Sequence, residues 1–145
     1  MAKGYEFVDH TADVEFVAYG KTLEELFENA LLAQFDTIAD IKKLTKSKQK
    51  VQTFLVSEKA RALDDLLWFV LQDALSVSDA EGLFGYAIKS LKIVSDGEYE
   101  IKVIVNAKKK EQKLSKLDVK GVSKFDLKIV EKKTGGFEAS VVLDV

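Results

Sequence analysis

Cysteine and proline are absent from the sequence, and histidine occurs once, as His10. The lack of cysteine excludes disulfides, cysteine-ligated zinc, iron–sulfur clusters and thiol catalysis, and it is consistent with a reducing compartment. A serine–histidine–aspartate triad or a histidine-bearing metal site would have to use His10. Since no GxSxG, HExxH or Walker-type P-loop motif occurs either, the familiar routes to hydrolase, protease and NTPase activity are mostly closed.

Neither charge nor hydropathy lies at an extreme. The 145 residues include 22 Lys and Arg against 24 Asp and Glu, a formal net charge of -2, and 47% of them are hydrophobic. This balance is typical of a folded globular chain and argues against a dedicated nucleic-acid binder, although it leaves room for a local basic patch. No stretch approaches the roughly 18 consecutive apolar residues of a membrane helix. We therefore expect one domain over residues 1–145, cytoplasmic, with no signal peptide and no membrane contact.

Two segments have the apolar spacing of helices. The first spans about residues 22–38, where Thr22 and Glu25 match a capping box. Its apolar stripe comprises Leu23, Leu26, Phe27, Ala30, Leu31, Phe35 and Ile38. The second is expected to begin near Ser57 and to end before Glu81. Its stripe comprises Leu63, Leu66, Leu67, Val70, Leu71, Ala74 and Leu75.

The other apolar runs are typical of strands, and they cover residues 14–19, 51–56, 86–94, 98–107, 125–130 and 137–142. Asp96-Gly97 and Gly135-Gly136 each separate two of these runs, which predicts two hairpins and hence antiparallel pairing. Within residues 98–107 an alternating pattern puts one apolar face toward the core. Together these elements predict an α+β fold, a mixed, mostly antiparallel sheet with two long helices packed on it.

Residues 108–116 form the most basic stretch of the chain, with five lysines. Such a run is usually a solvated loop, and the alternative is a patch that contacts phosphates. Because the stretch contains no arginine and no aromatic residue, it offers no platform on which bases could stack. We therefore expect RNA contact by this chain to be indirect or weak.

A dense polar cluster precedes the first predicted strand. Two carboxylates, an imidazole and a hydroxyl stand within five residues, Asp9, His10, Thr11, Ala12 and Asp13. A loop before a strand can aim such groups at one point, but Asp and Thr also favour turns, because their side chains bond to nearby backbone. From spacing alone the turn is the better interpretation.

The other end of the sequence offers a second acidic cluster. An apolar strand runs almost to Leu143-Asp144-Val145, which would hold the Asp144 side chain and a Val145 α-carboxylate in fixed positions. Two anionic groups so close repel each other unless a cation or a donor lies between them. Ligands that are all oxygen suit a hard cation such as Mg²⁺ or Ca²⁺. If Asp13 faces the same end of the sheet, the site gains a third carboxylate.

Both ends of the chain resemble one family. Residues 9–14 (DHTADV), 18–27 (AYGKTLEELF) and 138–145 (EASVVLDV) resemble the archease signature, and residues 64–67 (DDLL) and 81–83 (EGL) agree with it in order and spacing. The resemblance spans essentially the whole chain. It departs from the family pattern at residues 15–17, at Gly121 and at Lys124-Phe125.

The resemblance implies a function and a site. Archeases are accessory proteins that promote guanylylation and multiple turnover of the metal-dependent, GTP-using RNA ligase of tRNA splicing. The family's metal-binding positions fall on Asp13, Asp144 and Val145, which implies a divalent cation as cofactor. Its essential lysine falls on Lys120.

His10 and the adjacent Asp9 are expected to orient the N-terminal loop rather than to bind the cation, because a nitrogen ligand would be out of place among oxygens. Two alternatives stay open beside the activator. One is a stand-alone metal-dependent phosphohydrolase or nuclease, in which the carboxylates and the cation activate water. The other is a chaperone-like binding module with a structural cation. The cation itself is Mg²⁺, Ca²⁺ or Mn²⁺, and the oligomeric state is not encoded in any of these patterns.

Overall fold

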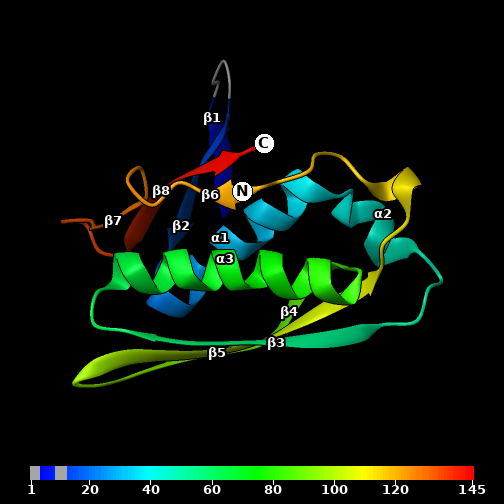
Figure 1. Ribbon diagram of the computed structural model, residues 1–145. Helices are drawn as coiled ribbons and strands as arrows, with labels where there is room; N and C mark the ends of the chain where they lie inside the picture. Colours follow the sequence, from blue (N-terminus) through cyan, green and yellow to red (C-terminus); the bar gives the residue numbers. More distant parts are fainter. Residues whose placement is uncertain (1–3, 9–12) are drawn as a thin grey trace.

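A computed structural model describes residues 4–8 and 13–145. Two antiparallel sheets enclose a layer of helices (Figure 1). In the first sheet the order is β1 (Tyr5–Val8), β2 (Val14–Gly20), β8 (Phe137–Asp144) and β6 (Gly121–Val122), and β7 (Lys128–Glu131) also pairs with β8. In the second sheet the order is β3 (Gln52–Ala60), β5 (Glu98–Lys109) and β4 (Leu83–Asp96). The predicted α+β class is confirmed, and the strands divide between two sheets where the sequence predicted one.

The two long helices, α1 (Leu23–Ile38) and α3 (Leu63–Glu81), lie between the sheets (Figure 1). Both predicted apolar stripes are largely buried. The strands supply the facing surfaces through their alternating inward side chains, among them Phe16, Val56, Ile101 and Val141. Both sheets therefore bury their apolar faces against the same layer of helices. Along residues 4–8 and 13–145, no helix combines the length and the apolar character needed to cross a bilayer.

The first helix begins as the sequence predicts. The Thr22 hydroxyl accepts a hydrogen bond from the Glu25 backbone amide at 3.1 Å, and the Glu25 carboxylate accepts one from the Lys21 backbone amide at 3.3 Å. At the other end of α1, the Phe35 ring lies against Gly85 of β4, where any added Cβ would stand 2.8 Å from the ring. A glycine is therefore needed for α1 to approach β4 closely.

The second long helix begins later than the sequence predicts. Ser57 lies in β3, opposite Lys102 of β5, and the alternating pattern of that strand continues to Ala60. Helix α3 begins at Leu63, and its first turn has no side-chain cap. A serine before an apolar run signals a helix start only when the backbone is not already paired in a sheet.

Both predicted hairpins are confirmed. The β4–β5 pair turns at Gly97 and the β7–β8 pair turns at Gly135 and Gly136, all with positive φ angles. The strand expected over residues 125–130 is wrong at its start, because Phe125 lies in a turn and is fully exposed.

A short helix not expected from the sequence, α2 (Ile41–Lys46), packs against the end of the second sheet. Its last turn is held by Lys108 of β5, whose Nζ donates to the Leu44 carbonyl at 2.5 Å and to the Ser47 carbonyl at 3.0 Å. A cation at a helix C-terminus is favourable, and the Tyr86 ring lies 5.0 Å from the same Nζ. The expectation of a solvated loop is wrong for Lys108, which is 3% exposed.

Two carboxyl groups meet between β3 and α3. Glu58 lies on the inward face of β3 and shares a hydrogen bond with Asp73 of α3. Burial, followed by this hydrogen bond and the Asp73 charge, raises the pKa of Glu58. The folded chain therefore binds this proton more tightly than the unfolded chain does. The associated stabilisation is present at low pH and is lost as the pH rises through the raised pKa.

We expect Glu58→Gln to raise the melting temperature near neutral pH, because the substitution removes the repulsion from Asp73. The gain should shrink toward zero below the ordinary glutamate pKa of 4.5. Thermal unfolding followed by circular dichroism across this pH range measures both effects. The matched control is Glu98→Gln, at the exposed start of β5. A melting temperature of the Glu58 variant that does not rise at neutral pH contradicts the prediction.

Candidate functional site

The pairing of β2 with β8 brings the two ends of the sequence together. Val14 lies opposite Leu143, and the register runs without a break to Gly20 and Phe137. Asp13 precedes Val14 and Asp144 follows Leu143, so the backbones of the two aspartates lie at the same end of the sheet. The condition that the sequence left open, that Asp13 faces the same end of the sheet as Asp144, is therefore met.

A third segment, which contains Lys120, lies at the same end of the sheet. Its backbone amide donates to the Asp144 carbonyl at 2.8 Å, and the Ser123 amide donates to the Val142 carbonyl at 2.9 Å. Gly121 lies opposite Asp144 in the short β6 pairing. A Cβ added at Gly121 would stand 3.9 Å from Oδ2 of Asp144, so the carboxylate lies over this glycine. The backbone of Lys120 thus lies next to Asp144 at the end of β8, and both residues are exposed.

The outer edge of β6 is completed by side chains of α3. The Val122 amide donates to Gln72 Oε1 at 2.6 Å, and the Val122 carbonyl accepts from Trp68 Nε1 at 2.8 Å. An edge strand otherwise presents unpaired amides and carbonyls. A glutamine four residues after a tryptophan can satisfy one group of each kind, since the two side chains lie on the same face of the helix. The sequence contained this signal, a Gln beside an apolar stripe, but only the fold gives it a partner.

The same helix also holds the residues that follow β6. Lys124 Nζ lies 5.2 Å from the Trp68 ring centre and 5.9 Å from that of Phe69, and the two rings pack edge to face. The Ser123 hydroxyl donates to the Asp126 carboxylate at 2.7 Å. The Lys120 segment is therefore fixed to β8 on one side and to α3 on the other.

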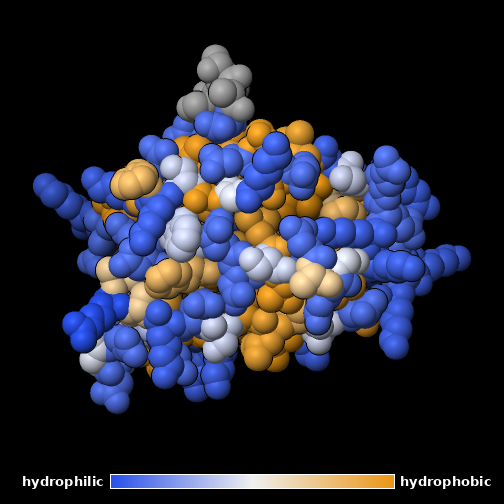
Figure 2. All heavy atoms as spheres, viewed as in Figure 1, coloured by the Kyte–Doolittle hydropathy of each residue, from blue (hydrophilic) through white to orange (hydrophobic). Residues whose placement is uncertain are grey.

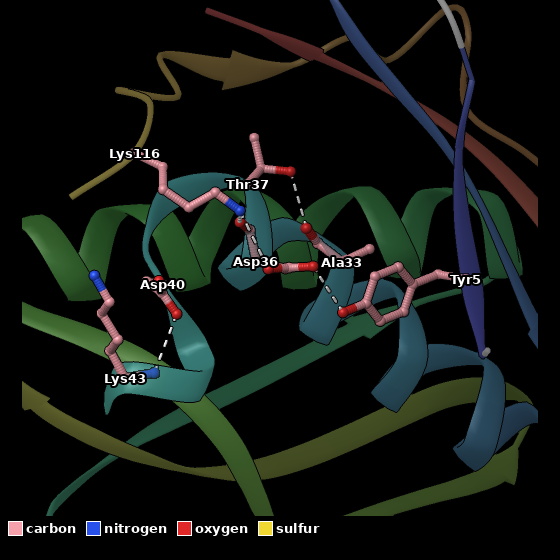
Figure 3. A network of polar contacts seen from close by, with 7 residues as sticks. All are labelled: Tyr5, Ala33, Asp36, Thr37, Asp40, Lys43 and Lys116. Atoms are coloured by element: carbon pink, nitrogen blue, oxygen red, sulfur yellow. Dashed lines mark hydrogen bonds and ion pairs between the residues drawn. The ribbon is translucent and has the colours of Figure 1, made fainter. Parts of the chain in front are cut away.

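Asp36, near the end of α1, connects the N-terminal strand to the segment that leads to Lys120. Figure 3 shows Tyr5 and Lys116 pointing at it from different elements. The Tyr5 hydroxyl donates to Asp36 Oδ2 at 3.0 Å, and Lys116 Nζ donates to the Asp36 carbonyl at 2.5 Å and approaches Oδ1 at 3.3 Å. Burial, with the Asp36 carboxylate beside it, raises the pKa of Tyr5 well above its ordinary value, so this hydroxyl stays a donor.

Asp13 and Lys116 both line a cavity of about 340 Å³ on this side of the molecule. Thr37 of α1 and Leu117 contribute to its wall. The Thr37 hydroxyl donates to the Ala33 carbonyl at 2.9 Å, so this buried hydroxyl is satisfied within α1. The candidate site is thus bordered by a lysine that Asp36 holds in place.

The donor set suits a hard cation. Asp13 and Asp144 supply carboxylate oxygens, and a Val145 α-carboxylate would add a third, the ligand type that Mg²⁺ and Ca²⁺ prefer. Over the described ranges 4–8 and 13–145, no three His, Cys, Asp or Glu side chains are grouped so as to hold a metal ion. The expected set contains only two such side chains, and it stays a prediction. Asp9 and His10 lie outside the described residues.

Comparisons with known proteins show which family the chain resembles. The model of the Archease protein family (MTH1598/TM1083) matches residues 5–145. Protein archease of Methanosarcina mazei is 34% identical over 148 residues, covering 100% of this chain and 98% of the relative. Protein archease of Pyrococcus furiosus is 34% identical over 143 residues, covering 97% and 98%.

Solved structures share the fold. The solution structure of Methanobacterium thermoautotrophicum protein 1598 superposes with a TM-score of 0.81 at 30% identity, over 99% of this chain and 100% of that one. The crystal structure of a Thermotoga maritima archease, described as a possible chaperone, superposes with a TM-score of 0.60 at 18% identity, over 95% and 94%. Since the family model and the relatives match nearly the full length of the sequence, the chain belongs to the archease family.

Proposed function

We propose that this chain activates the GTP- and metal-dependent RNA ligase of tRNA splicing, by promoting guanylylation and repeated turnover of that ligase, and catalyses no reaction itself. The observation that supports the proposal is the meeting of three segments at one sheet end. The β2–β8 register and the hydrogen bond from the Lys120 amide to the Asp144 carbonyl bring the backbones of Asp13, Lys120 and Asp144 to the same end of the sheet. These are the residues to which the archease resemblance assigns cation binding and activation.

The chemistry follows from charge. A divalent cation bound by Asp13, Asp144 and a Val145 carboxylate would neutralise phosphate charge during nucleotidyl transfer. Lys120 adds a compact positive charge next to that position, which can contact a phosphate or an acidic group of the ligase. The exposure of Lys120, Asp144 and Val145 suits a site that acts on a partner's surface. A stand-alone hydrolase would instead be expected to bury its reacting groups in a closed pocket.

The cation site predicts a specific sensitivity of the C-terminus. A chain extended by one glycine after Val145 should bind Ca²⁺, Mg²⁺ or Mn²⁺ at least about tenfold more weakly, since even outer-shell partners of metal ligands contribute that much to affinity. Asp13→Asn and Asp144→Asn should have the same effect, and Asp96→Asn, at the exposed end of β4, should have none. Isothermal titration calorimetry measures these affinities. Unchanged affinity of the extended chain would exclude Val145 as a ligand.

The activator role predicts that Lys120→Ala lowers multiple-turnover ligation by at least about tenfold, the scale of losing one charge that stabilises a phosphoryl-transfer transition state. Lys133→Ala, in the exposed β7–β8 turn, is the matched control and should retain full stimulation. The assay follows guanylylation of the ligase and joined RNA over many turnovers. Two results would contradict the proposal. One is GTP or RNA turnover by this chain alone that Asp13→Ala abolishes, and the other is stimulation that survives Asp144→Asn in a folded protein.

The position of Lys120 depends on α3. Gln72→Leu should speed hydrogen exchange at the Val122 amide, corresponding to about 1–3 kcal/mol for an acceptor lost from a backbone donor. Ligase stimulation should fall although Lys120 is still present. Gln72→Glu keeps an accepting oxygen and should restore both readouts. If Gln72→Leu accelerates exchange without lowering stimulation, the order of this segment has no part in activation.

A further inference from the structure

Lysines are concentrated in two segments that lie far apart in the sequence. Residues 40–50 and 108–116 together hold ten lysines and two carboxylates, so the rest of the chain has 12 Lys and Arg against 22 Asp and Glu. The near-zero net charge therefore hides a strong separation of charge. Such a separation creates a positive potential over one region even in a chain of negative net charge.

The fold packs these two segments together. Lys108 of the second segment donates to the Leu44 and Ser47 carbonyls of the first, and Gln49 Nε2 donates to Glu111 Oε1 at 2.5 Å. Figures 1 and 2, drawn in the same view, show hydrophilic side chains covering the end of the molecule around α2. The neighbouring lysines of both segments are exposed, namely Lys42, Lys43, Lys46, Lys48, Lys50, Lys109 and Lys113.

A cavity of about 660 Å³ lies between the two segments. Three exposed lysines line it, Lys43, Lys48 and Lys113. The one carboxylate in its wall, Glu111, accepts from Gln49 and approaches Lys113 Nζ at 3.3 Å. The cavity thus carries an excess of positive charge around a concave surface, which suits an anionic ligand.

We propose that this lysine cavity binds the phosphodiester backbone of an RNA strand. The proposal goes beyond ligase activation, because it assigns this chain a direct contact with nucleic acid at a second site. Lysines that neutralise successive phosphates release condensed counterions, and this supplies sequence-independent affinity. No aromatic residue occurs in either segment, so the contact is to phosphates and not to stacked bases.

The composition of this face favours RNA over an acidic protein partner. Protein interfaces concentrate aromatic residues at their centre and are depleted in lysine. Here the centre is lysine, glutamine, serine and glutamate, and the one apolar residue in the wall, Leu114, is buried. Lys108, Lys110 and Lys116 bind groups of the fold itself, so the proposal rests on the exposed lysines.

The same polypeptide connects this cavity to the carboxylate site. Residues 114–120 are fixed at both ends, by the Asp40 amide donating to the Leu114 carbonyl at 2.9 Å and by the Lys120 amide donating to Asp144 at 2.8 Å. Between them the Lys116 amide donates to the Ile38 carbonyl at 2.8 Å. Seven residues span at most about 25 Å, so one RNA strand could reach from the cavity to the carboxylate site.

Fluorescence anisotropy with a labelled single-stranded RNA tests the proposal on the intact chain. The triple variant Lys43→Glu, Lys48→Glu, Lys113→Glu should bind at least about tenfold more weakly. The slope of log affinity against log salt should become shallower by about 2, since each phosphate contact to a single strand contributes about 0.7. The matched control Lys89→Glu, Lys128→Glu, Lys133→Glu makes the same change of net charge elsewhere and should keep affinity within about twofold.

A second variant tests the cavity by a gain of affinity, independently of any loss of folding. Glu111→Gln removes the carboxylate from the wall and should tighten RNA binding about threefold, while an amide can still bond to Gln49. Unchanged affinity of this variant would overturn the placement of the RNA in the cavity.

Two further outcomes would overturn the proposal. Equal losses in both triple variants would show only unspecific attraction to the whole surface. Displacement of the RNA by a polyglutamate peptide at the same concentration of charge would identify an acidic protein surface as the ligand instead. Loss of RNA binding with normal ligase stimulation, or the reverse, separates this site from the proposed activation site.

Discussion

The pairing of β2 with β8 is the interaction on which the rest of the structure depends. Its seven register pairs put Phe16 opposite Val141 and Ala18 opposite Ala139, on the face that packs against α1. A slip of one residue would turn all of these side chains outward and bring charged ones in. The buried face therefore fixes the register, and the register fixes which residues meet at the strand ends. Asp13 and Asp144 lie at the same end of the sheet because Phe16 and Val141 must both be buried.

Because the helices lie between the two sheets, α3 also contacts the segment that contains Lys120. Helix α3 packs its apolar stripe against the second sheet, while Trp68 and Gln72 reach the backbone of Val122 at the edge of the first. One helix thus serves the core and also holds the Lys120 segment. A change in the packing of α3 would therefore shift the Lys120 segment, although Lys120 is not part of that helix. Stability and the proposed activation are in this way coupled through the same element.

Positive and negative charges are concentrated in different parts of the molecule. The carboxylate site and the lysine cavity lie at the two ends of one segment, residues 114–120, and their charges are opposite. This arrangement supports both proposals, since a carboxylate site would attract a cation and a lysine cavity would attract phosphates. The net charge of -2 conceals it, because the sum over a chain carries no information about position.

Local physical chemistry is what the sequence alone determined here. The capping box at Thr22, the apolar stripes of both long helices and the glycine turns of both hairpins depend on neighbours a few residues apart, and they were predicted correctly. The resemblance of both ends to archeases likewise needed no coordinates.

Tertiary structure decided whatever depends on residues distant in sequence. A periodic pattern shows that a face is buried but not against what, so the division into two sheets and the role of Gln72 were not predictable. The predicted start of α3 is wrong because Ser57 is paired in β3. The prediction of a solvated loop is wrong for Lys108 because its acceptors, the Leu44 and Ser47 carbonyls, lie at the C-terminal end of α2. The placement of Asp13, Lys120 and Asp144 at one sheet end, like the packing of the two lysine segments, follows from pairing between distant residues, which local sequence patterns do not contain.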